Sequence, residues 1–300
     1  MTHKLFKALS DLVRPSRSRL FEPLFVTFTN TKHGRTRELY ECTLRKLRSF
    51  DPDFSSMPAE AVTHEWLCAF EAFLARTAPS RNARNIHLRN IRTVYYIALD
   101  DGIVSRNPFR RFKIRAEPTR KRALTLAQLR KFATVGIEPW LEKYRDAFLL
   151  MFMLRGINVV DFCNLRSIDG QMIRYRRAKT GTLFEIRVEP EALALIRKLS
   201  GKGQLLYPLD RVKDYRTYTG RINKALQRIA ATIPGFPAIT TYWARHTWAT
   251  LAASIDIPKE TIAAALGHSS NSVTDIYIDF DTRKIHSANR RLIRHVFGES

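Results

Sequence analysis

Apolar side chains recur with the period of a helix through the first third of the chain. Spacings of i, i+1, i+4, i+7 and i+8 indicate one stripe of an amphipathic helix, formed by Trp66, Leu67, Phe70, Phe73 and Leu74. We predict that this helix starts near Pro58 and stops before Pro79. A second helix is predicted from Ser80, a favourable N-cap residue, to about Asp101. Residues 21–112 are therefore expected to form a helical domain, preceded by a tail over residues 1–20.

The second of these helices has two contrasting faces. Its apolar positions turn one way, at Leu88, Ile91, Tyr95 and Ala98. Four arginines gather on another side, at Arg81, Arg84, Arg89 and Arg92. A solvated face is the usual explanation for a run of charge. The lack of interleaved acidic residues nevertheless favours a surface that faces phosphates.

Periodicity is lost over residues 107–122, which hold two prolines and many cations. We expect an extended linker, assigned to residues 113–122, that follows a polyanion instead of packing as an element. Its basic end supplies three candidate contacts, Arg120, Lys121 and Arg122. Beyond it, residues 123–300 are expected to form a second domain.

The second domain is predicted to be mixed. Thr125, with Gln128 three residues later, has the pattern of a capping box at the start of a helix. A buried helix is expected through residues 147–154, interrupted at Gly156. Residues 172–179 and 184–188 have β-propensity and flank a Thr-Gly-Thr turn, which predicts a hairpin. The fold class is thus mainly α with a small β-hairpin or sheet.

Helices are expected again after Pro190 and dominate to the end. The last of them, within residues 283–297, carries an apolar stripe made of Ile285, Leu292, Ile293 and Val296. This stripe could dock on the chain's own core or on a neighbouring copy.

Charge limits the class of partner. The chain has 51 Lys and Arg against 28 Asp and Glu, a formal net charge of +23, which favours salt-sensitive attraction to a polyanion such as nucleic acid. A ribosomal or chromatin-type binder fits this charge as well as an enzyme does. Hydrophobic residues make up 45% of the chain, enough to bury real cores, so a disordered basic tail is excluded.

Cysteine usage and the N-terminus point to the cytosol. Cys42, Cys68 and Cys163 are odd in number and show no C-x-x-C pairing, so we expect core thiols and no metal site. The N-terminal apolar stretch is too short for a signal peptide, and no run reaches membrane-spanning length. A cytoplasmic protein that associates with the nucleoid when bound is expected.

Several side chains of the second half could act together on one phosphodiester. A tyrosine, whose ordinary pKa is about 10, must be helped by a base or by cations before it can attack phosphorus. Two arginines can stabilise the charge that gathers on the nonbridging oxygens without a metal ion, and a lysine in a hairpin turn can protonate the departing oxygen. Candidates for these functions follow one another along the chain as Arg155, Lys179, Arg245, His268 and Tyr277.

As an ordered set, these residues resemble the tyrosine recombinase (phage integrase) family. The resemblance rests on residues 153–161, the Lys179 hairpin, Tyr242 with Arg245 and His246, residues 266–268, and Tyr277 nine residues after His268.

The resemblance implies a role for each matching position. Arg155 and Arg245 would clamp the scissile phosphate, and His268 would hydrogen-bond to it. Lys179 would protonate the leaving 5′-oxygen, and Tyr277 would become the 3′-phosphotyrosine.

Three further positions, one acidic and two with aromatic rings, belong to the resemblance. Asp161 would orient the first arginine. Tyr242 stands where most members have His or Lys; it can donate a hydrogen bond but accepts a proton poorly at neutral pH. His246 is interpreted as a supporting or packing residue.

The resemblance also implies an architecture and partners. It predicts a helical N-terminal core-binding domain and a mixed α+β catalytic domain that close on double-stranded DNA with short inverted core sites. A homotetramer on paired sites would carry out integration, excision or inversion, and its C-terminal helix would pack on a neighbour. No cofactor is expected, because the phosphotyrosine conserves the energy of the broken bond. The alternatives are a type IB topoisomerase and a catalytically inactive DNA-binding regulator on the same fold.

Overall fold

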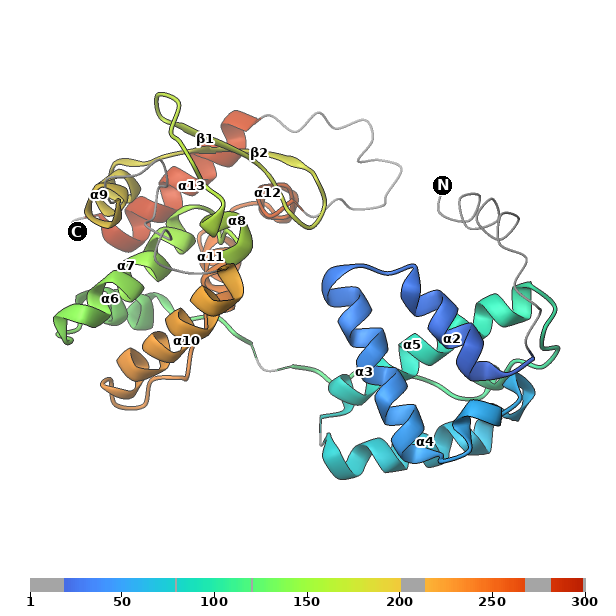
Figure 1. Ribbon diagram of the computed structural model, residues 1–300. Coiled ribbons are helices and arrows are strands. Elements are labelled where there is room, and N and C mark those ends of the chain that lie inside the picture. The colour runs from blue at the N-terminus through green and yellow to red at the C-terminus, as the bar shows by residue number, and fades with distance from the viewer. Residues whose placement is uncertain (1–18, 79, 120, 201–213, 268–281, 299–300) are drawn as a thin grey trace. The chain divides into compact units, whose positions relative to one another are not determined.

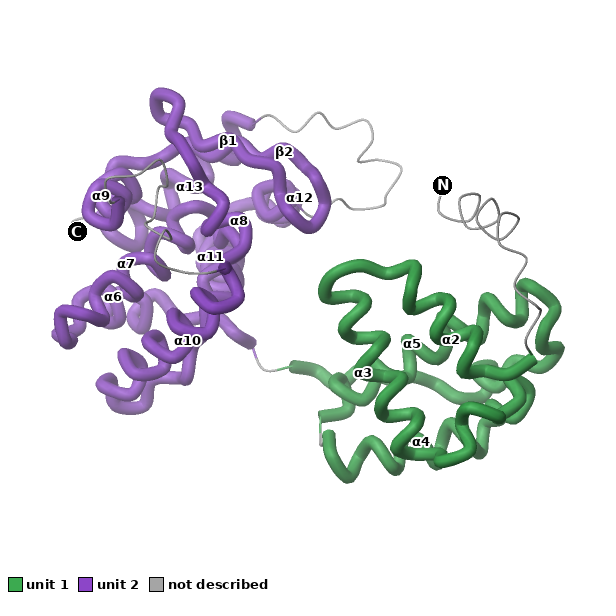
Figure 2. The backbone as a smooth tube through the Cα atoms, viewed as in Figure 1, with its two compact units in different colours: residues 1–119 green, residues 120–300 purple. Residues whose placement is uncertain are grey.

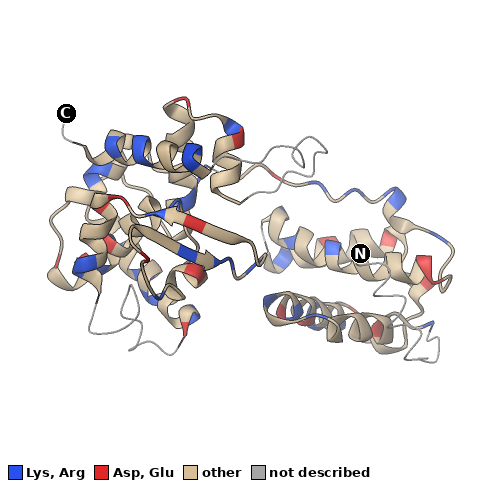
Figure 3. Cartoon of the chain, turned by 90° about the horizontal axis from the view of Figure 1, so that it is seen from above, with Lys and Arg blue, Asp and Glu red and all other residues tan. Residues whose placement is uncertain are grey.

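The protein, seen as a computed structural model, divides into two compact units, residues 1–119 and 120–300 (Figure 2). The structure describes residues 19–78, 80–119, 121–200, 214–267 and 282–298. Each unit buries its own hydrophobic core, and basic positions are spread over both (Figure 3). The predicted fold class is confirmed, because the described residues form helices and a two-stranded antiparallel sheet (Figure 1).

Unit 1 is a helical bundle. Its described helices are α2 (Phe21–Asn30), α3 (Gly34–Phe50), α4 (His64–Thr77) and α5 (Arg81–Asp100), with short 3-10 turns at Phe54–Ser56, Ala59–Ala61 and Pro108–Arg110. Helix α5 packs on α2, α3 and α4. The predicted stripe of α4 faces this core, with Leu67, Phe70 and Leu74 fully buried. Trp66 and Phe73 lie at its edge.

A buried polar cluster joins α3 to α5. The Thr43 hydroxyl donates to the Leu39 carbonyl at 2.9 Å and accepts from Asn90 Nδ2 at 2.9 Å. His87 Nδ1 lies 2.9 Å from the same hydroxyl. Since the hydroxyl proton is already used, His87 must be the donor, which fixes its neutral Nδ1–H tautomer. Burial, aided by the charge of Lys46, lowers the pKa of His87 to about 4.

One prediction within unit 1 is wrong in detail. Helix α4 begins at His64 and not near Pro58, because Thr63 is the N-cap residue and its hydroxyl accepts the Trp66 N–H at 3.1 Å. The intervening Ala59 and Val62 are buried as well, so apolar periodicity alone could not mark the start of the helix.

The segment after α5 packs on unit 1 at its start, whereas residues 113–119 form no helix or strand and are mostly exposed. Phe109 and Phe112 are buried in the core of unit 1. The Asn82 side chain donates to the Glu117 carbonyl at 2.8 Å and accepts its N–H at 3.1 Å. Asn85 Nδ2 donates to the Arg115 carbonyl at 2.9 Å. Two amide side chains of α5 thus satisfy backbone groups of the segment as far as Glu117.

Unit 2 surrounds one central helix. Its described elements are α6 (Leu126–Thr134), α7 (Pro139–Met153), α8 (Val159–Cys163), β1 (Met172–Arg176), β2 (Leu183–Arg187), α9 (Pro190–Leu199), α10 (Tyr215–Ala231), α11 (Tyr242–Ser254), α12 (Lys259–Ala265) and α13 (Thr282–Phe297). Helix α7 packs on α6, α9, α10 and α11. Residues 146–153 are all buried, which confirms the predicted buried helix.

Local signals of unit 2 are confirmed in detail. Thr125 and Gln128 form both bonds of the capping box at the start of α6, at 3.2 and 2.9 Å. Strands β1 and β2 form the predicted hairpin, with Ile173 opposite Ile186 and Tyr175 opposite Phe184.

Helix α13 packs within its own chain. Its apolar stripe lies in the core of unit 2, against α6, α11, α12 and β2 (Figure 1). Asn289 accepts from Trp248 Nε1 at 2.8 Å and donates to the Met153 carbonyl at 3.0 Å. The stripe is thus docked on the chain's own core, and its packing on a neighbouring copy stays a prediction.

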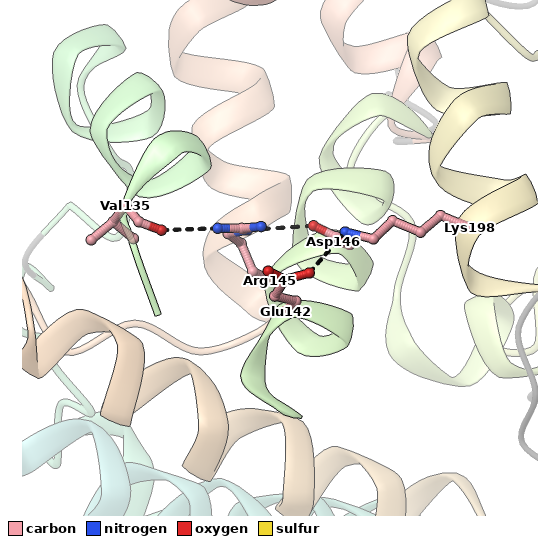
Figure 4. A network of polar contacts seen from close by, with 5 residues as sticks. All are labelled: Val135, Glu142, Arg145, Asp146 and Lys198. Carbon is pink, nitrogen blue, oxygen red and sulfur yellow. Dashed lines mark hydrogen bonds and ion pairs between the residues drawn. The ribbon is translucent and has the colours of Figure 1, made fainter. Parts of the chain in front are cut away.

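A charged network ties α9 to the central helix (Figure 4). Asp146 of α7 is 3% exposed, and its Oδ2 lies 2.7 Å from Lys198 Nζ of α9. Lys198 also contacts Glu142 at 3.1 Å. Arg145 lies 3.4 Å from the other Asp146 oxygen and donates to the Val135 carbonyl at 2.9 Å. The buried carboxylate is thus paired with two cations, as burial requires.

The cysteines differ from the prediction. Cys163 is buried, Cys42 is half-buried and Cys68 is exposed. Cys68 follows Leu67 by one residue on α4, and one residue turns a helix by about 100°, so its thiol points away from the core. Only Cys163 is a core thiol, and burial raises its pKa to about 12. No helix among the described residues is long and apolar enough to cross a membrane.

Candidate functional site

Arg155 occupies a left-handed turn directly after α7. Its φ is +58° and that of Gly156 is +64°. A non-glycine residue held there costs about 1–3 kcal/mol, and such strain clusters at functional sites. The side chain is 4% exposed, and its Nη2 donates to the Glu185 carbonyl of β2. The guanidinium therefore reaches the hairpin and does not cap the end of its own helix.

Gly156 brings the Arg155 turn against α11. A Cβ at this glycine would lie 2.3 Å from Arg245 Cα and 2.8 Å from its Cβ, so only glycine fits. Arg245 Nη1 donates to the Gly156 carbonyl at 3.3 Å. This contact places the two predicted arginines beside each other although 90 positions separate them in the sequence.

Both arginines are partly desolvated. Burial lowers the pKa of Arg155 to about 10. It also lowers the pKa of Arg245, and the neighbouring charge of Arg177 lowers it further. Arg155 still carries its charge at neutral pH because its pKa lies well above 7. A buried cation without a carboxylate partner attracts an anion strongly, and Arg155 forms no ion pair with any described residue.

Lys179 lies in the exposed turn of the hairpin, as predicted. Asp161 of α8 is 2% exposed, and its Oδ1 accepts the Ala178 N–H at 2.8 Å. Among the described residues Asp161 forms no hydrogen bond or ion pair with Arg155, so its predicted role in orienting that arginine stays a prediction. Asp161 holds the turn that carries Lys179.

Tyr242 is the first residue of α11 and is 50% exposed. Its ring meets the His246 ring edge to face, with centroids 4.6 Å apart and an interplanar angle of 82°. His246 is half-buried, and burial lowers its pKa, followed by the charges of Arg122 and Arg245. His246 thus packs beside the site and supports the Tyr242 ring.

His268 and Tyr277 lie outside the described residues. The chain approaching them is described as far as Gly267, at the end of α12. Arg245 Nη2 donates to the Leu266 carbonyl, and Arg177 Nη1 donates to the Gly267 carbonyl at 3.3 Å. Gly267, the residue before His268, is therefore hydrogen-bonded to Arg177, and the preceding Leu266 to Arg245.

Two site residues were missed by sequence reasoning, Tyr175 and Arg177. Tyr175 is half-buried on β1 and stacks on Phe184, with ring centroids 5.4 Å apart. Burial raises its pKa and Asp161 adds to the rise, while the charges of Arg155, Arg245 and Arg177 oppose it. Strand alternation, which puts positions 173, 175 and 177 on one face, was the signal that could have found both.

The four arginines of α5 differ in their exposure to solvent. Arg81 and Arg89 are exposed, and Arg84 and Arg92 are half-buried. Arg81 lies 3.9 Å from Glu117, and Arg84 donates to the Ala78 carbonyl at 2.9 Å. In unit 2, Lys121 and Arg122 are exposed. Arg120 lies outside the described residues.

Comparison with known families covers both units. Residues 21–114 match the phage integrase SAM-like domain, and residues 123–284 match the phage integrase family. No curated protein matches the chain.

Solved structures share the fold. The Tn1549 transposon integrase in complex with circular intermediate DNA is 18% identical, with a TM-score of 0.68 over 91% of this chain and 99% of that one. A lambda integrase tetramer bound to a Holliday junction is 17% identical, with a TM-score of 0.65 over 91% and 84%. A lambda integrase dimer bound to a COC′ core site is 16% identical, with a TM-score of 0.66 over 87% and 97%.

Proposed function

This chain belongs to the phage integrase family of tyrosine recombinases, and we propose that it cleaves and rejoins DNA at specific sites through a 3′-phosphotyrosine on Tyr277. The observation that carries the proposal is the packing of Gly156 on Arg245. It brings the turn of Arg155 against the helix that carries Arg245, and two arginines on adjoining segments can supply the charge that a pentacovalent phosphate needs.

The chemistry follows from these positions. The Tyr277 oxygen attacks phosphorus, forming an O–P bond, and the bond from phosphorus to the 5′-oxygen breaks. Arg155 and Arg245 stabilise the charge on the nonbridging oxygens, together with a hydrogen bond from His268. The Lys179 ammonium gives a proton to the 5′-oxygen, and Tyr277 passes its own proton to His268 or to solvent water. Attack by a 5′-hydroxyl of a second strand reverses these steps and needs neither ATP nor a metal ion.

Tyr242 assists this chemistry as a hydrogen-bond donor. Tyr242 is half exposed at the start of α11, in the helical turn that carries Arg245. A neutral phenol can donate to a nonbridging oxygen but is a poor base at neutral pH. The deprotonation of Tyr277 therefore depends on His268 and on the cations.

The proposed partner is double-stranded DNA with short inverted core sites, bound by a homotetramer in the cytoplasm, at the nucleoid. The arginine face of α5 and the exposed Lys121 and Arg122 supply phosphate contacts. Solved relatives of the same fold include a tetramer on a Holliday junction, which supports paired sites and four protomers. Integration, excision and inversion all use this chemistry.

Trapping of the covalent intermediate tests the proposal. Purified protein is incubated with nicked duplexes built from inverted repeats that flank its gene, and adducts are separated on a denaturing gel. We expect an adduct with the wild type and none with Tyr277→Phe. Tight binding without any adduct would favour an inactive regulator. An adduct without strand exchange between two duplexes, together with relaxation of supercoils by monomers, would favour a type IB topoisomerase.

A further inference from the structure

Arg177 closes the base of the turn that carries Lys179. Its N–H donates to the Thr182 carbonyl at 2.9 Å, and its carbonyl accepts from Thr180 and Gly181 at 3.2 and 2.8 Å. Lys179 projects from the turn that these three bonds close. The backbone position of the lysine therefore depends on where residue 177 is held.

The side chain of Arg177 anchors this turn to the end of α12. Its Nη1 donates to the Gly267 carbonyl at 3.3 Å. Phe184 of β2 packs on the same glycine, because a Cβ at position 267 would lie 2.3 Å from the Phe184 ring. The hairpin is thus fixed to Gly267 by one hydrogen bond and one close apolar contact, next to the Leu266 carbonyl that accepts from Arg245.

The neighbouring Arg176 lacks such an anchor. It is exposed, and its Nη1 donates to Gly181 within the turn itself at 3.2 Å. The two arginines are adjacent in the sequence and carry the same charge. Of the two, only Arg177 connects the turn to another element. Arg176 is a matched control.

We propose that Arg177 is a positioning residue, which docks the Lys179 turn on Gly267 so that the lysine ammonium faces the leaving 5′-oxygen. The inference rests on the proposed function. In the cleavage step the Tyr277 oxygen bonds to phosphorus, the bond from phosphorus to the 5′-oxygen breaks, and a proton moves from Lys179 to that oxygen. Arg177 affects only the last of these events, the proton transfer from Lys179.

The test compares two leaving groups on the duplex at which the wild type forms its adduct. One substrate has the ordinary 5′-oxygen; the other has sulfur at that bridging position, and a thiolate leaves without being protonated. On the oxygen substrate, Arg177→Gln should form adduct about 10²-fold more slowly, part of the range that general acid catalysis contributes. On the sulfur substrate it should approach the wild-type rate, as should Lys179→Met.

Two further variants sharpen the comparison. Arg177→Lys keeps a donor for Gly267 and should recover part of the lost rate on the oxygen substrate. Arg176→Gln should match the wild type on both substrates. Urea unfolding of every variant checks that the fold is retained.

The outcomes separate this inference from the proposed function. An equal defect of Arg177→Gln on both substrates would overturn it, because Arg177 would then act on the phosphate or on the fold. A wild-type rate of Arg177→Gln on the oxygen substrate would also overturn the inference. If the wild type forms no adduct on either substrate, it is the proposed function that fails.

Discussion

Replacing Gly156 with alanine tests whether the packing of the Arg155 turn on α11 aligns the two arginines. The added Cβ would lie 2.3 Å from Arg245 Cα, whereas carbon atoms in good contact lie about 3.5–4.0 Å apart. The turn and α11 must therefore separate by roughly 1 Å. A displacement of about 1 Å in a catalytic group costs on the order of 10²-fold in rate.

The stability of unit 2 should fall as well. Alanine at a φ of +64° costs about 1–2 kcal/mol, and overpacking adds about 1–3 kcal/mol. We expect the free energy of unfolding to drop by about 2–5 kcal/mol, measured by urea denaturation. The protein should remain folded at low denaturant, so that the rate of adduct formation can be compared with that of the wild type.

Gly235→Ala is the matched control. Gly235 has a φ of +70°, and no heavy atom lies within 4 Å of the position that an added Cβ would take. This variant should lose only the backbone contribution, about 1–2 kcal/mol, and form adduct at the wild-type rate. The reasoning is refuted if Gly156→Ala loses no more stability than Gly235→Ala, or if it forms adduct equally fast.

Three other predictions concern single side chains. Tyr242→Phe should slow adduct formation modestly and Tyr277→Phe should abolish it; equal losses would contradict the assigned roles. Because the folded protein holds the pKa of His87 near 4, below its ordinary 6.5, stability should fall by up to about 3 kcal/mol as the pH drops from 6.5 to 4. In urea titrations at several pH values His87→Gln should flatten this slope, and an unchanged slope would exclude His87 as its cause. Asn289→Ala leaves the buried Trp248 N–H without its acceptor and should cost about 1–3 kcal/mol in thermal unfolding; an unchanged midpoint would contradict the bond's importance.

Local rules predicted those elements whose signals are local. The capping box at Thr125 and the hairpin around residues 172–187 depend on neighbours within a few positions, and both are confirmed. The start of α4 was misplaced because Ala59 and Val62 continue the apolar pattern in a 3-10 turn. A side-chain cap at Thr63, not hydrophobicity, determines where that helix begins.

Contacts between distant segments could be predicted less well. Sequence order named Arg155 and Arg245, but the reason that they meet is Gly156, whose missing Cβ admits Arg245. Asp161 was assigned to Arg155, since nothing in the sequence shows that its carboxylate reaches the Ala178 N–H. Arg177 was not among the predicted site residues, because only the folded hairpin brings it to Gly267.

The most direct test of the central claim is identification of the residue that carries the DNA. Trypsin cleavage after Lys259 and Arg283 yields the peptide 260–283, in which Tyr277 is the one tyrosine. Mass spectrometry of this peptide from a trapped, nuclease-digested adduct should find a nucleotide joined to Tyr277 through its 3′-phosphate. Attachment to a serine, to another tyrosine or through a 5′-phosphate would contradict the account.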